Sequence, residues 1–142
     1  MIKFDPKYFK RADYYKPQTE KFLAAAYRDL KIASGSAIVE VKFQFSYNAL
    51  IKLGISLIAL SGYKVSSRTG HHVKIIEKAS EILDDKNILI FGNSMRKTRN
   101  TELYDGGAAL VSEKQADEYL HFVKGLFKTS EKIFKDKLGR LV

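Results

Sequence analysis

Apolar side chains recur every three or four positions along most of this chain, which is the period of a helix buried on one face. Five stretches show this spacing, and the expected helices cover residues 17–33, 36–62, 71–83, 86–104 and 112–137. Short connections between long helices favour antiparallel neighbours. The pattern therefore predicts an all-α fold, an up-and-down bundle of four to five main helices in a single domain of residues 1–142.

The start of the expected helix 36–62 also carries a strand-like signal. Residues 38–45 alternate between apolar and polar side chains, whereas Val41, Phe45 and Ala49 recur at helical spacing. No other segment reads as a strand that could pair with this one, so a helix is preferred and the conformation of 36–45 stays open. The apolar tract that follows is shorter than the ~20 residues of a membrane span, which predicts a buried core helix and no membrane partner.

The remaining segments are predicted from their polar residues. Residues 3–16 interleave aromatic and basic side chains, which either stack on single-stranded nucleic acid or form a short amphipathic helix, capped by Asp5, that closes the bundle. Residues 63–70 are expected to form a polar loop. The glycines at 106–107 allow a left-handed helix end. Ser112 and the glutamine three positions later form a capping box at the start of the last helix.

Charge is the compositional feature that bears on function. The chain has 25 Lys and Arg residues against 16 Asp and Glu, a net charge of +9, which attracts polyanions such as nucleic acid. The alternative is a lysine-rich surface that serves solubility. The absence of cysteine excludes disulfides and thiolate chemistry. It fits a reducing compartment, and no apolar leader is visible at the N-terminus, so a cytoplasmic location is expected.

The densest group of chemically useful side chains lies in the helix that ends near Tyr104. Arg96 and Arg99 can each donate paired hydrogen bonds to a phosphate, and Lys97 adds charge. Asn100 offers a further donor, and Tyr104 a hydroxyl group or a stacking ring. The alternative is that these cations only complement the negative end of the helix dipole.

A second group stands where the expected helix 71–83 begins. Arg68 precedes it, and His71 and His72 occupy its first turn, where free N–H groups and the helix dipole favour an anion and lower a histidine pKa. Alternatively, the histidines are partial caps beside a polar loop. Adjacent helical residues do not face each other, so no metal site is predicted, and no cofactor motif is present. Whether these histidines lie near Arg99 is left open.

The two groups together resemble the HEPN family (higher eukaryotes and prokaryotes nucleotide-binding domains). The resemblance rests on Gly70-His71-His72 at the start of one helix and on Arg96-Lys97-Thr98-Arg99-Asn100-Thr101-Glu102-Leu103-Tyr104-Asp105 at the end of the next. Many members of that family are metal-independent endoribonucleases, often toxins paired with a small nucleotidyltransferase antitoxin. They act as homodimers that bring two arginine–histidine signatures to one cleft.

The resemblance assigns expected roles to individual residues. Arg99 matches the family's arginine, Asn100 the polar residue after it, and Tyr104 stands where the family has its histidine. A phenol, with a reference pKa of about 10, is a poor base at neutral pH. His71 or His72 could take its place if the fold brings the start of their helix near Tyr104, so catalysis is left open. The resemblance thus implies an RNA- or nucleotide-binding homodimer, with a ribonuclease toxin as its enzymatic form. The alternative is a non-catalytic helical module that dimerises and binds a partner such as a small nucleotidyltransferase.

Overall fold

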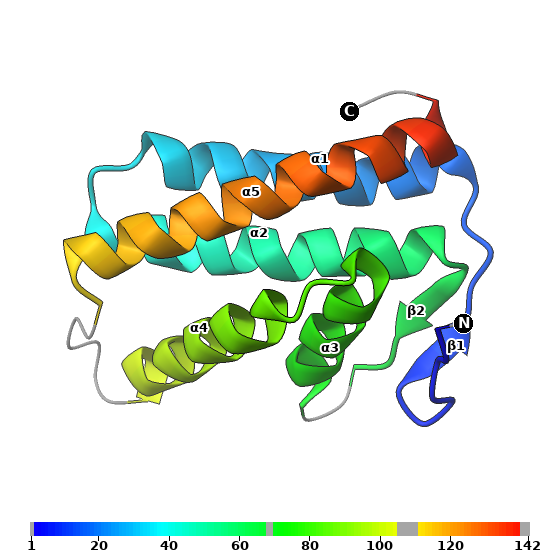
Figure 1. The fold of residues 1–142 in the computed structure, drawn as a ribbon, viewed down its shortest axis with the longest axis horizontal. Coiled ribbons are helices and arrows are strands. Elements are labelled where there is room, and N and C mark those ends of the chain that lie inside the picture. The colour runs from blue at the N-terminus through cyan, green and yellow to red at the C-terminus, as the bar shows by residue number, and fades with distance from the viewer. Residues whose placement is uncertain (1, 68–69, 105–110, 140–142) are drawn as a thin grey trace.

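The computed structural model describes residues 2–67, 70–104 and 111–139, with the backbone alone for 102–104. This part of the chain contains five helices and two short strands (Figure 1). The helices are α1 (Lys16–Gly35), α2 (Val39–Leu60), α3 (His71–Leu83), α4 (Asn87–Tyr104) and α5 (Glu113–Leu138). The strands are β1 (Phe9–Arg11) and β2 (Tyr63–Val65). The predicted all-α bundle is confirmed, and the expected helix limits agree with the observed ones to within three residues.

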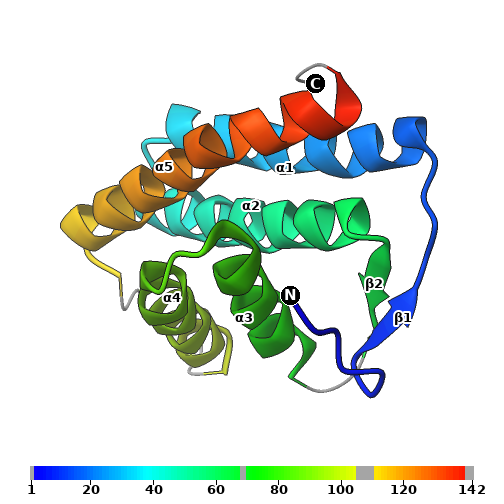
Figure 2. The ribbon, with the colours of Figure 1, turned by 45° about the vertical axis from the view of Figure 1, so that its right-hand side comes forward.

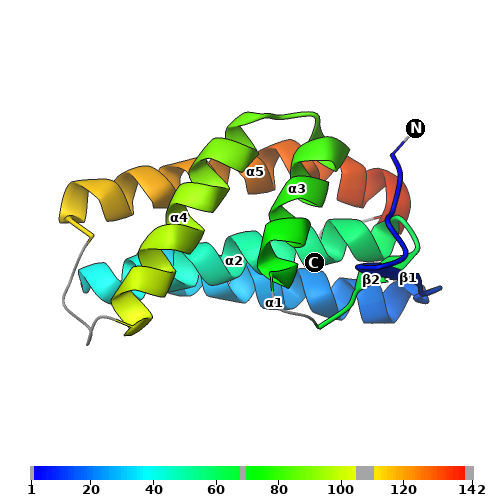
Figure 3. The same cartoon turned by 90° about the horizontal axis from the view of Figure 1, so that it is seen from below.

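Helix α2 is the centre of the bundle. It packs against each of the other helices, with α1 and α5 on one side and α3 and α4 on the other (Figure 1). The pair α3 and α4 crosses α2 obliquely (Figure 3). Because each neighbour buries a different side of α2, its buried residues lie all around the helix, and they include Phe43, Tyr47, Leu50, Ile51, Leu53, Leu57 and Ile58.

The structure answers the open question about residues 36–45. Ile38 has an extended backbone and the helix starts at Val39. Phe43 and Tyr47 lie one helical turn apart within it and are both buried, at 0% and 1% exposed. Among the described residues, α2 is the one helix long and apolar enough to cross a bilayer. However, 67% of its most apolar window is buried inside the protein, which is the environment of a core helix.

The prediction of a short first helix was wrong, and so was the prediction of a loop over all of 63–70. Asp5 instead caps a turn, in which its carboxylate accepts a hydrogen bond from the Lys7 N–H at 2.9 Å. The chain then pairs β1 with β2 in antiparallel register, with Phe9 opposite Val65, beside the end of α2 (Figure 2). A strand of three residues is too short to show periodicity, and its partner lies far along the chain.

Phe4 and Phe9 of the N-terminal segment pack against Lys78 of α3, and Phe4 also packs against Tyr63 of β2. The ammonium group of Lys78 is buried and lies 4.8 Å from the ring centre of Phe4 and 5.3 Å from that of Phe9. It also donates a hydrogen bond to the carbonyl oxygen of Lys3. The ring of Phe4 stacks on Tyr63 with centres 4.0 Å apart. These cation–π and stacking contacts hold the segment in place, so these rings are engaged within the molecule.

Two helical glycines let α3 approach its neighbours closely. A Cβ atom on Gly54 of α2 would lie 2.5 Å from Cγ2 of Ile75, and one on Gly92 of α4 would lie 2.8 Å from Cγ2 of Ile76. Both isoleucines are 1% exposed and have little room to move. The glycines therefore set the distance of α3 from α2 and from α4.

We expect Gly54→Ala to be less stable than Gly125→Ala by about 1–3 kcal/mol, the usual cost of overpacking a core. Gly125 lies in α5, and a Cβ atom added there would meet nothing within 4 Å, so it serves as the matched control. Both changes share the gain of ~1 kcal/mol in helix propensity, and the difference isolates the contact with Ile75. Urea unfolding of the two variants measures it, and equal stabilities would contradict a close approach of α2 and α3.

Candidate functional site

A tyrosine of α2 and a histidine of α3 form a hydrogen-bonded pair on the side of α2 that faces α3 and α4. The hydroxyl oxygen of Tyr47 lies 2.8 Å from Nδ1 of His72, and Tyr47 is 1% exposed. His72 is half-buried in the first turn of α3. The buried phenol thus holds one ring nitrogen of His72 and leaves the other edge of the ring for further contacts. We call Tyr47 and His72 the tyrosine–histidine pair.

Two arginines of α4 lie beside this pair. The Cζ atom of Arg99 is 5.9 Å from the ring centre of Tyr47, and Arg96 stands three positions earlier, on the same side of the helix. Nε of Arg96 donates a long hydrogen bond of 3.4 Å to the side-chain oxygen of Asn93. Within the described residues, neither guanidinium group forms an ion pair with a carboxylate. We call Arg96 and Arg99 the arginine pair.

Burial keeps both members of the tyrosine–histidine pair uncharged, and the arginine pair adds to this effect at His72 only. Burial lowers the pKa of His72 to about 4, and the charges of His71, Arg99 and Arg96 act in the same direction. Burial also raises the pKa of Tyr47 to about 12, against the opposing effect of the two arginines. At neutral pH the site therefore consists of two neutral polar side chains next to two positive ones.

Local backbone geometry places His72 where α3 begins. Gly70 is the residue before the helix and has a φ of 81°, a left-handed conformation that glycine adopts without strain. It provides no side-chain cap for the first turn. The rings of His71 and His72 meet edge to face with centres 4.6 Å apart. The close approach of α3 to α2 and α4 at Gly54 and Gly92 then brings this turn to the arginine pair.

The structure joins parts of the two groups that the sequence analysis proposed separately. Arg96 and Arg99 lie close enough to His72 to lower its pKa, which answers the question of whether the start of α3 lies near Arg99. Lys97 is exposed, and Asn100 is half-buried beside Arg99 on α4. Arg68 and the side chain of Tyr104 lie outside the described residues. The roles assigned to these residues stay predictions.

Tyr47 is the member of the site that the sequence analysis missed. It lies in the most apolar helix, where an aromatic residue is ordinarily core. A buried tyrosine usually needs a hydrogen-bond partner, which is a signal that the sequence contains. The partner, however, is 25 positions away in another helix, and no pattern in the sequence points to it.

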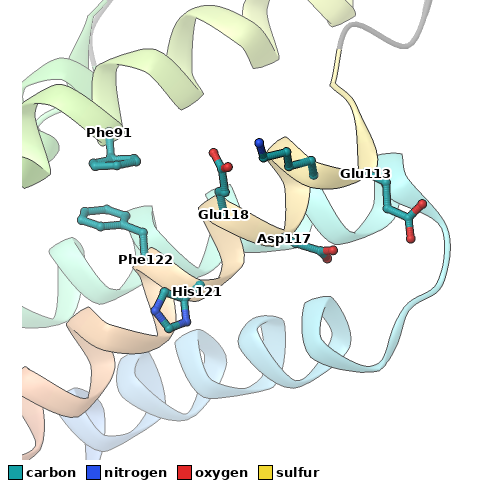
Figure 4. Close-up of a pocket in the computed structure, with 7 residues that line it drawn as sticks. Phe91, Glu113, Asp117, Glu118, His121 and Phe122 are labelled. Carbon is teal, nitrogen blue, oxygen red and sulfur yellow. The ribbon is translucent and has the colours of Figure 1, made fainter.

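A large hollow lies elsewhere, between α4 and α5 (Figure 4). It has a volume of about 870 Å³ and is wide open to solvent. The rings of Phe91 and Phe122 stack across it with centres 4.6 Å apart, and Glu118 points toward α4 (Figure 4). Asp117, also in its lining, pairs with Lys42 at 2.6 Å. None of the four residues of the tyrosine–histidine and arginine pairs lines this hollow.

In the described part of the chain, no group of three or more His, Cys, Asp or Glu side chains is placed to hold a metal ion. Comparison of the chain with protein-family models, with curated proteins and with solved structures found no match. The functional interpretation therefore depends on the side chains of the site, which combine two cations without acidic partners in the described structure with a neutral, half-buried histidine.

Proposed function

We propose that this protein is a HEPN-like nucleotide- or RNA-binding protein, and that the arginine pair and His72 bind a phosphate group. The observation that carries the proposal is the placement of Arg96 and Arg99 beside His72 with no carboxylate paired to either guanidinium in the described structure. Two cations held together repel each other, and a phosphate offers the bidentate acceptor geometry that arginine fits best.

The net charge supports the same kind of ligand. A chain with a charge of +9 attracts a polyanion over a distance, and the arginine pair gives that attraction a defined place to bind. A single phosphate bound there would meet both guanidinium groups and the ring of His72. The homodimer and the nucleotidyltransferase partner implied by the HEPN resemblance stay predictions alongside this binding site.

Cleavage of RNA would require more than this binding. Attack of a 2′-hydroxyl on the adjacent phosphate needs a proton acceptor and positive charge to stabilise the transition state. The arginine pair supplies the charge. The endoribonuclease hypothesis and the hypothesis of a non-catalytic binding module therefore differ in whether a proton acceptor reaches the bound phosphate.

Arg99→Ala is expected to weaken binding of a fluorescent single-stranded RNA about tenfold or more, because a charge-assisted hydrogen bond to phosphate is lost. The slope of log affinity against log salt concentration should fall by ~0.7, the effect of one phosphate contact with a single strand. Fluorescence anisotropy at several salt concentrations measures both quantities. The same tubes, with EDTA added, report cleavage when the RNA is run on a gel.

Arg28→Ala is the matched control, since Arg28 is an exposed arginine of α1, and α1 lies on the other side of α2 from α3 and α4 (Figure 1). Equal losses in the two variants would mean that only surface charge matters and would contradict the proposed site. Cleavage by the wild type that disappears in Arg99→Ala would identify an enzyme. Binding without cleavage would identify the non-catalytic module.

A further inference from the structure

The burial of Tyr47 indicates which of the two side chains, Tyr47 or His72, donates the hydrogen bond between them. Either the phenol donates to Nδ1, or a proton on Nδ1 is donated to the phenol oxygen. Tyr47 is 1% exposed, so water cannot readily serve its hydroxyl group. In the described structure the ring nitrogen of His72 is its one hydrogen-bonding partner, at 2.8 Å.

A buried hydroxyl hydrogen needs an acceptor, because leaving a buried donor unpaired is costly. If His72 donated from Nδ1, the phenolic hydrogen of Tyr47 would have no acceptor among the described residues. If Tyr47 donates instead, its hydrogen is paired with the lone pair of Nδ1. A neutral imidazole has one hydrogen, which must then reside on Nε2.

We infer that Tyr47 holds His72 as the Nε2–H tautomer, so that His72 acts as a hydrogen-bond donor to the phosphate and not as a proton acceptor. The role of His72 as a donor to phosphate rests on the proposed function, whereas its tautomer follows from the geometry of the tyrosine–histidine pair alone. Tyr47 is thereby a positioning residue. It acts on the ligand through His72.

The groups that face His72 favour the neutral ring that this assignment needs. They are Tyr47 on α2, its neighbour His71 on α3, and Arg96 and Arg99 on α4. The two arginines carry positive charge, and a proton added to His72 would repel both. The ring thus stays neutral with its single hydrogen directed away from Tyr47.

Side chains that can only donate hydrogen bonds restrict the class of ligand that the site can bind. The guanidinium groups and Nε2–H of His72 all require acceptor oxygens, which a phosphate monoester or diester provides. They offer no lone pair to accept the proton of a 2′-hydroxyl group. Proton abstraction from RNA would need a group other than His72, so this constellation favours binding of nucleotide phosphates over their cleavage.

Nuclear magnetic resonance of the protein labelled with ¹⁵N in histidine tests the tautomer directly. Long-range ¹H–¹⁵N correlation spectra at pH 7 distinguish a protonated Nε2 from a protonated Nδ1, and His72→Gln identifies the signals of His72. We expect one pure Nε2–H form in the wild type and a mixture with the Nδ1–H form in Tyr47→Phe. A wild-type ring protonated on Nδ1 would overturn the assignment.

Addition of uridine 3′-monophosphate to the labelled protein tests the donor role. The Nε2 signal of His72 should shift in the wild type, and Tyr47→Phe should weaken binding about fivefold, the scale of one neutral hydrogen bond. An unmoved Nε2 signal despite binding measured by anisotropy would refute the donor role alone. No binding of this nucleotide or of RNA in the anisotropy assay would refute the phosphate site, and the spectrum of the free protein would still report the tautomer.

Discussion

Acidification from pH 7 to pH 4 is expected to lower the free energy of unfolding of the wild-type chain by about 3 kcal/mol more than that of a His72→Gln variant. Burial and three neighbouring positive or ionisable groups lower the pKa of His72 from its usual 6.5 to about 4. As the pH falls, the unfolded chain therefore takes up a proton on this residue before the folded chain does. Proton uptake by the unfolded state favours unfolding.

The sign and the range of this effect follow from the two pKa values. The stability that His72 contributes is present above pH 6.5 and is lost progressively as the pH falls toward about 4, below which the folded state is protonated as well. Glutamine cannot take up this proton, yet it still offers an acceptor to Tyr47. Carboxylates that titrate in the same range affect both proteins alike, so the difference between the proteins isolates His72.

Urea unfolding of the two proteins at pH 7, 5 and 4 measures this difference. A difference that stays constant over the whole range would contradict a buried, neutral His72. It would also remove the electrostatic support for the donor role, because an exposed histidine would become charged near its usual pKa.

The double variant Arg96→Gln, Arg99→Gln is expected to lose RNA affinity by about a hundredfold or more at low salt while keeping its stability. Each guanidinium lost removes a charge-assisted contact with phosphate. Neither group forms an ion pair with a carboxylate in the described structure, so the folded protein loses little when both charges are removed. Glutamine is also a good helix former, which limits any change in α4 itself.

Weaker RNA binding together with unchanged stability distinguishes the proposed phosphate site from the alternative that the arginines only complement the helix dipole. If the arginines only complemented the helix dipole, their removal would cost up to about 1 kcal/mol of stability and leave RNA binding unchanged. The matched control is Lys128→Gln, Lys132→Gln, which removes two exposed charges from α5. An equal loss of RNA affinity in the control would show that net charge, and not the arginine pair, determines binding.

Side chains of a functional site are expected to contribute strongly to ligand binding and little to the free energy of unfolding. Like charges held together next to a desolvated histidine do not help the chain to fold, and a ligand that neutralises them makes the arrangement favourable. On this view, a nucleotide phosphate should raise the melting temperature of the wild type. The same ligand should have little effect on the double variant.

The sequence by itself determined the helices and most of their limits. Apolar residues at helical spacing are a local property of a segment, and so are the capping residues, because both act within one or two turns. The capping box predicted at Ser112 is present in the structure, where its side chain accepts a hydrogen bond from the Gln115 N–H at 3.1 Å. The spacing of Arg96 and Arg99 on one side of a helix is local in the same sense.

Only the tertiary structure decided what these local elements meet. β1 pairs with β2 across more than fifty residues of chain, and three-residue strands carry no periodic signal of their own. Tyr47 belongs to the site because α2 presents it to His72, which depends on how closely the helices pack at Gly54 and Gly92. Periodicity describes which side of a helix is buried, whereas contacts between helices depend on the shapes of both surfaces.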